Sequence, residues 1–138
     1  MTRVSGNRNV GIGRIGLAAV ASVAISTAWY TAWGDRLGRL HPAYAGDTRP
    51  PAWVPPVELA RSATVATGVA ALAHRTGVAG TGEALALGAG LWTAFPLVML
   101  SGSVVHEKVP WQLAAIHGGD WLLKLLAIAA VVGGGRRA

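Results

Sequence analysis

A single uncharged run near the N-terminus limits what this chain can fold into. From Ile15 to Trp33 the sequence IGLAAVASVAISTAWYTAW contains no Asp, Glu, Lys or Arg. The hydrocarbon core of a bilayer is roughly 30 Å thick and needs about 20 apolar residues of helix to cross it. The run therefore predicts a membrane-spanning helix. The composition agrees, because only 13% of the residues are charged, against about 25% in a typical soluble domain.

Three further apolar segments extend this prediction to an all-α integral membrane protein. We expect a four-helix bundle with antiparallel up-down topology, in which residues 1–138 form a single membrane domain. A Pro-rich loop, 34–56, joins the first two helices, and Pro96 within the third predicts a kink. The expected spans are 15–33, 57–75, 83–105 and 111–134.

The second expected span is the least apolar of the four. Its small residues recur at helical spacing along two neighbouring ridges, and ridges of this kind let helices pack closely in lipid. An Ala-rich composition produces the same pattern without any role in packing, so both interpretations stay open. The ridges consist of Ala60, Thr64 and Gly68, and of Ala63, Thr67 and Ala71.

Four crossings place both termini on the same side of the membrane. Arginines precede the first span at Arg3, Arg8 and Arg14 and follow the last at Arg136 and Arg137. The positive-inside rule then favours cytoplasmic termini in a multi-pass protein of the cell membrane. A cleaved signal peptide is the alternative, with 43–45 (AYA) as its cleavage site. However, that site follows a charged segment, and the apolar run before it is long for a signal sequence.

Aromatic residues gather on the face opposite the expected termini. Trp and Tyr are common where a membrane meets water, but nearly all of them fall on one side here. This distribution predicts an aromatic rim around a mouth on that face. The rim would comprise Trp29, Tyr30, Trp33, Trp53 and Trp111.

The last span carries the most informative polar residues, in the segment IHGGDWLLK. At 100° per residue, His117, Asp120 and Lys124 fall within an arc of about 60° on one helix face. An unpaired charge at the bilayer centre costs about 2.5–3.5 kcal/mol. We therefore expect Asp120 and Lys124 to pair, and His117 to donate to Asp120 or to cap the outer end of the stripe.

Three interpretations of this intramembrane polar site stay open. It is a proton or ion relay or a binding site for a polar ligand, a structural ion pair that fixes helix register, or an interfacial group with a snorkelling Lys124. The first fits a small transporter or permease-like protein working as a homo-oligomer. The second fits a non-catalytic membrane scaffold or accessory subunit. A membrane enzyme ranks third, because no catalytic constellation is visible.

Other classes of site have little support in the sequence. The chain has no cysteine, and His106, Glu107 and His117 lack the spacing of a zinc site, so neither a metal nor a cofactor is expected. The run GIGRIG, 11–16, matches a dinucleotide-binding pattern but leads into a membrane span. Basic residues do not alternate with aromatic ones, which argues against nucleic acid as a partner. The expected partners are the lipid bilayer, further copies of the chain, and an ion or small molecule that the sequence does not identify.

Two segments resemble a known family. They are STAWYTAWGDRLGRL at the end of the first span and LWTAFPLVMLSGSVVHEKVPWQLAAIHGGDWLLKLLAIAAVVGG across the last two. Together with the length of the chain, they are similar to domain-of-unknown-function family 1761, over about Ile15 to Gly134. The resemblance implies a small bacterial membrane protein with four predicted spans. It implies no activity, and the Pro-rich loop departs from the family pattern.

Overall fold

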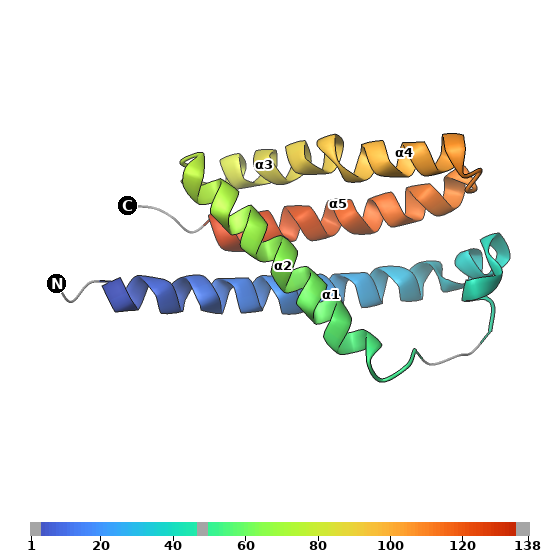
Figure 1. The fold of residues 1–138 in the computed structure, drawn as a ribbon, viewed down its shortest axis with the longest axis horizontal. Helices are drawn as coiled ribbons and strands as arrows, with labels where there is room; N and C mark the ends of the chain where they lie inside the picture. Colours follow the sequence, from blue (N-terminus) through green and yellow to red (C-terminus); the bar gives the residue numbers. More distant parts are fainter. Residues whose placement is uncertain (1–3, 47–49, 135–138) are drawn as a thin grey trace.

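The computed structural model describes residues 4–46 and 50–134 of the chain, and their regular structure is helical throughout (Figure 1). The all-α prediction is therefore confirmed for these residues. In chain order the elements are α1 (Val4–Leu40), the 3-10 turn η1 (Pro42–Tyr44), α2 (Val54–Arg75), α3 (Thr81–Ala94), α4 (Pro96–His106) and α5 (Trp111–Gly133). Arg3, Arg136 and Arg137, on which the orientation prediction partly depends, lie outside the described residues.

Helix α1 is longer than the sequence pattern predicts. The expected loop at 34–56 does not begin at Gly34, because α1 continues without interruption to Leu40. A glycine within a helix costs about 1 kcal/mol relative to alanine. Burial of Leu37, which is 2% exposed and packs with Leu113 and Ile116, offsets this cost. Tertiary packing therefore decides where this helix ends.

Helix α2 also begins earlier than predicted, at Val54. Pro55 and Pro56 lie in its first turn, where the missing N–H groups would have no intrahelical partner in any case. At Pro96 the expected kink is a complete break, since Phe95 (φ −120°, ψ −72°) separates α3 from α4. The two helices together still form one continuous apolar segment, 81–106.

Three helical segments of the described chain are long enough and apolar enough to cross a membrane: 11–40, 81–106 and 111–133. Helix α2 is long enough, at 22 residues, but it is not among the three. It carries the exposed ion pair of Glu58 and Arg61 near its start and ends at His74 and Arg75. The expected second span is therefore a helix whose apolar character falls below that of its neighbours.

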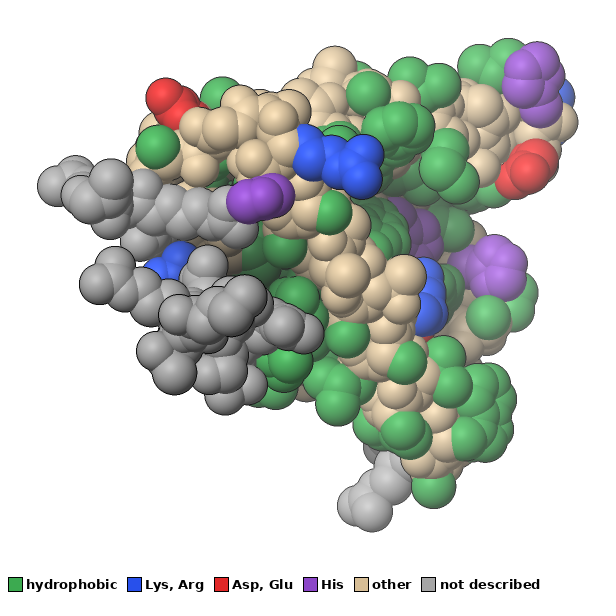
Figure 2. Space-filling view, turned by 60° about the vertical axis from the view of Figure 1, so that its left-hand side comes forward, with side chains coloured by type: hydrophobic (Ala, Val, Ile, Leu, Met, Phe, Trp, Pro, Cys, Tyr) green, Lys and Arg blue, Asp and Glu red, His purple; other side chains and the backbone are tan. Residues whose placement is uncertain are grey.

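Helix α5 lies at the centre of the fold and packs against α1, α2, α3 and α4. In Figure 1, α1 and the pair α3–α4 lie on opposite sides of α5, and α2 crosses α1 and α5 obliquely. The start of α1 and the end of α5 lie at the same end of the molecule. Figure 2 shows a face composed mostly of hydrophobic and other uncharged atoms, with few charged side chains.

The two small-residue ridges predicted on α2 do not form its packing face. Ala60, Thr64 and Gly68 are exposed, and a Cβ added to Gly68 would meet no atom within 4 Å. The buried stripe of α2 falls on other positions: Ser62, Ala66, Val69 and Ala73. Of these, Ala66, Val69 and Ala73 pack with Ala18, Ile128 and Val132 in an apolar core at one end of the fold.

Candidate functional site

The polar residues of α5 lie beside two adjacent glycines, and near these glycines two indole rings donate hydrogen bonds to the backbone of the helix. Trp29 of α1 donates from Nε1 to the carbonyl oxygen of Ile116 at 2.8 Å, and Trp92 of α3 donates to that of Gly118 at 2.8 Å. A Cβ on Gly119 would overlap the ring of Trp29. The absence of that carbon therefore lets α1 approach α5 closely.

Close approach brings a serine of α1 to Asp120. Ser26 donates from Oγ to Oδ1 of Asp120 at 2.6 Å, and Nζ of Lys124 lies 3.5 Å from Oδ2. Both carboxylate oxygens are thus engaged. Asp120 is 2% exposed and Lys124 is 6% exposed, so both groups are buried within the protein, and the depth of the pair in a membrane stays a prediction.

The ammonium group of Lys124 has a second stabilising neighbour. It lies 4.3 Å from the ring centroid of Trp121, within the range of a cation–π interaction. A carboxylate on one side and an aromatic face on the other compensate part of the desolvation cost of a buried charge. The ammonium group of Lys124 is therefore stabilised by two side chains of its own helix.

One buried hydroxyl near this pair is unsatisfied. Ser22 is 0% exposed, and its Oγ has no hydrogen-bond partner among the described residues. Helices α1 and α5 are antiparallel, with Trp29 opposite Ile116 and Ser26 opposite Asp120. One turn further along, the same register brings Ser22 to the level of Lys124. An unpaired buried hydroxyl costs about 1–3 kcal/mol, so this position calls for an explanation.

His117 lies between two phenols at the other end of the polar stripe. The hydroxyl of Tyr30 is 2.6 Å from Nδ1, and that of Tyr44 on η1 is 3.5 Å from Nε2. The expected donation from His117 to Asp120 is not formed. His117 instead ends the stripe, which was the other arrangement expected for it. Tyr44 is 42% exposed, so the stripe reaches the surface at this end.

The residues of the predicted aromatic rim take two different positions. Trp29, Tyr30 and Trp33 pack inward against the cluster of Leu37, Leu113 and Ile116, whereas Trp53 and Trp111 are 64% and 66% exposed. A rim that includes all five stays a prediction. In the described part of the chain, no three His, Asp or Glu side chains come close enough together to hold a metal ion.

Sequence reasoning identified the ionisable residues of this site but missed their partners. Ser22 and Ser26 look like ordinary residues of an Ala-rich helix, although their spacing of one turn places both hydroxyls on the same helix face. The glycine pair next to Asp120 is a stronger signal, since two adjacent glycines in a helix allow a neighbouring helix to approach closely.

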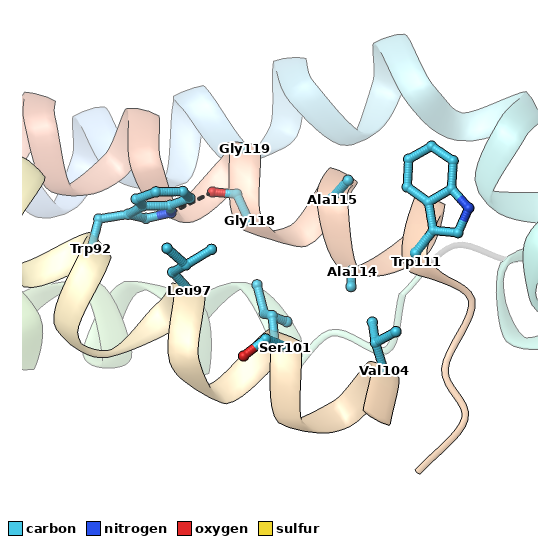
Figure 3. Close-up of a pocket in the computed structure, with 10 residues that line it drawn as sticks. Trp92, Leu97, Ser101, Val104, Trp111, Ala114, Ala115, Gly118 and Gly119 are labelled. Carbon is cyan, nitrogen blue, oxygen red and sulfur yellow. Dashed lines mark hydrogen bonds between the residues drawn. The ribbon is translucent and has the colours of Figure 1, made fainter. Parts of the chain in front are cut away.

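A separate groove runs along the opposite side of the Gly-Gly step, between α4 and α5. It has a volume of about 460 Å³. Figure 3 shows Trp92 and Trp111 at its two ends, with side chains of both helices between them. Neither Asp120 nor Lys124 belongs to its lining. The lining residues are Trp92, Leu97, Leu100, Ser101, Val104, Trp111, Ala114, Ala115, Gly118 and Gly119.

Comparison with known proteins gives one match. The family model described as a protein of unknown function (DUF1761) matches residues 14–133, which confirms the resemblance seen in the sequence. A search of curated proteins and a search of solved structures found no match.

Proposed function

The chain belongs to the DUF1761 family of proteins of unknown function, and we propose that it is a non-catalytic membrane scaffold or accessory subunit. In this proposal the ion pair of Asp120 and Lys124 holds α5 against α1. The observation that carries it is the burial of the pair: the two residues are 2% and 6% exposed, with Ser26 bonded to Asp120. The groove between α4 and α5 does not reach this pair, since neither Asp120 nor Lys124 lines it.

A double-mutant cycle tests this proposal. Asp120→Asn or Lys124→Met alone leaves one buried charge without its partner, which costs about 3–5 kcal/mol. The double variant removes both charges and should regain most of the lost stability. Unfolding of the full-length protein by dodecyl sulfate in mixed micelles measures all four free energies. Additive losses, with the double variant the least stable of the four, would contradict a structural pair.

The unsatisfied Ser22 Oγ favours a second candidate, a small ion or proton carrier. A buried hydroxyl at the level of Lys124 is a group that a water molecule or a translocated ion would complete. The stripe reaches the surface at the His117 end, whereas Ala18 and Ile128, both 0% exposed, lie in the apolar core beyond Ser22. A single copy would therefore offer access from one side.

The substitution Ser22→Ala separates the two candidates. If Ser22 binds neither water nor an ion, removal of its unpaired buried hydroxyl is neutral or stabilising. If it binds water or an ion, the variant loses stability, and vesicles that contain it lose any ion or proton flux that the wild type supports. Ser62→Ala in α2 is a matched control, since Ser62 is also buried, at 4% exposed.

We also propose that the chain crosses the membrane four times, with cytoplasmic termini. Helix α1 and the pair α3–α4 run in the same direction, and α5 runs in the opposite one (Figure 1). The chain must therefore return between Leu40 and Thr81, and α2 is the long helix in that interval. Reporter fusions after Arg75 and after α5 should report the same side. Reporters on opposite sides of the membrane would contradict the four-crossing arrangement.

A further inference from the structure

The groove between α4 and α5 has the shape and chemistry of a site for a single hydrocarbon chain. Its side walls carry Leu97 and Val104 from α4 and Ala114 and Ala115 from α5. Two polar side chains within it already have partners: Trp92 Nε1 donates to Gly118 O, and Ser101 Oγ donates to Val98 O. A ligand in the groove would therefore be recognised by its apolar surface.

The length and position of the groove indicate where its occupant comes from. From Trp111 to Gly119, a rise of 1.5 Å per residue gives about 12 Å, close to half of a bilayer core roughly 30 Å thick. Trp111, 66% exposed at the start of α5, is the residue type that marks the interface with water. The groove thus runs from one membrane surface to the middle of the bilayer.

Volume decides between two possible occupants. A helix about 10 Å across would need roughly 900 Å³ over this length, about twice the 460 Å³ available. A second copy of the chain could therefore insert side chains here but not a helix. An extended hydrocarbon chain is much narrower than a helix, so part of one acyl chain can lie within this volume. We propose that the groove binds one acyl chain of a membrane lipid from the leaflet at the Trp111 end, which requires that the protein lies in a bilayer.

Two substitutions should block this site without disturbing the core. Ala115 and Ser101 are exposed and line the groove from opposite helices, so Ala115→Trp or Ser101→Trp would fill it with an indole. Ala32→Trp is a matched control, because Ala32 is an exposed alanine on α1, away from the groove lining. The use of two blocking variants protects the test against one that fails to fold.

Photolabelling provides the test. The full-length protein is reconstituted into phosphatidylcholine vesicles that contain a phosphatidylcholine with a diazirine at the end of one acyl chain. We expect severalfold more adducts on Leu97, Leu100 and Gly118 than on the exposed face of α1 around Ala28. Ala115→Trp and Ser101→Trp should abolish the excess, and Ala32→Trp should not. Labelling of α1 reports insertion independently, so failure of the groove site is distinguishable from failure of membrane insertion.

Two kinds of result would overturn the proposal. One is equal labelling of the groove and of α1, or an excess that both blocking variants leave unchanged. The other is an Ala115→Cys variant that forms a disulfide-linked dimer in these vesicles while the groove stays unlabelled, since a second copy would then cover it. The chain has no cysteine of its own, so such a dimer can form only through the introduced residue.

Discussion

Substitution of the two adjacent glycines of α5 should change stability in opposite directions. A Cβ on Gly119 would lie 3.0 Å from Cη2 of Trp29 and closer still to Cζ2. A Cβ on Gly118 would lie 3.4 Å from Leu100 Cδ1 and 3.9 Å from Trp92 Cζ2, both ordinary contacts. The two positions are neighbours in one helix, so each controls for the other.

The expected free energies follow from three terms. Overpacking against the indole costs about 1–3 kcal/mol, and displacement of its hydrogen bond to Ile116 costs about 1 kcal/mol more. Alanine gains up to about 1 kcal/mol over glycine within a helix. Gly119→Ala should therefore lower the free energy of unfolding by about 1–4 kcal/mol, whereas Gly118→Ala should raise it by up to about 1 kcal/mol.

Titration with dodecyl sulfate in mixed micelles, followed by far-ultraviolet circular dichroism, measures both variants. Trp29→Phe in the Gly119→Ala background should restore part of the loss, because the shorter ring clears the new methyl group. Equal destabilisation by the two alanines would refute the argument. So would a Gly119→Ala variant as stable as wild type, since the close approach of α1 to α5 would then not depend on this glycine.

Three further predictions concern individual contacts, each measured as a change in unfolding free energy in the same micelles. Ser26→Ala should cost about 1.5–3 kcal/mol, because it removes a hydrogen bond to a buried carboxylate. A loss below about 0.5 kcal/mol, the usual effect of a surface substitution, would contradict this. Tyr30→Phe should cost about 1 kcal/mol and Tyr44→Phe clearly less, since its contact with His117 is longer and exposed; the reverse order would count against the arrangement. Gly88→Ala should be destabilising, because its Cβ would lie 2.9 Å from the Leu125 carbonyl oxygen, whereas Gly90→Ala meets nothing within 4 Å and should be tolerated.

Some of this structure was predictable from local sequence patterns. The 100° periodicity alone places His117, Asp120 and Lys124 on one face of α5, and the cost of a lone charge in lipid predicts the ion pair. The break at Phe95 follows from the chemistry of Pro96, which lacks an N–H group. These inferences needed only one helix at a time.

The remainder depended on which helices meet. The sequence around Leu37 does not show that this residue will be buried against α5. The contact between Leu37 and α5 is what extends α1 beyond Gly34. The small-residue ridges of α2 could not be assigned to a packing face without knowing its partners, and the stripe around Ala66 is the one that packs. Ser26 became identifiable as a partner of Asp120 only once the antiparallel register of α1 and α5 was known.

The central position of α5 has a consequence for how the protein is made. Synthesis proceeds from the N-terminus, so the ribosome delivers α1, α2 and the pair α3–α4 before the helix against which all of them pack. Until α5 has been made, the indoles of Trp29 and Trp92 lack their carbonyl acceptors and Ser26 lacks its carboxylate. These contacts, and the packing of the earlier helices on α5, can therefore form only after the segment that carries Asp120 and Lys124 has been made.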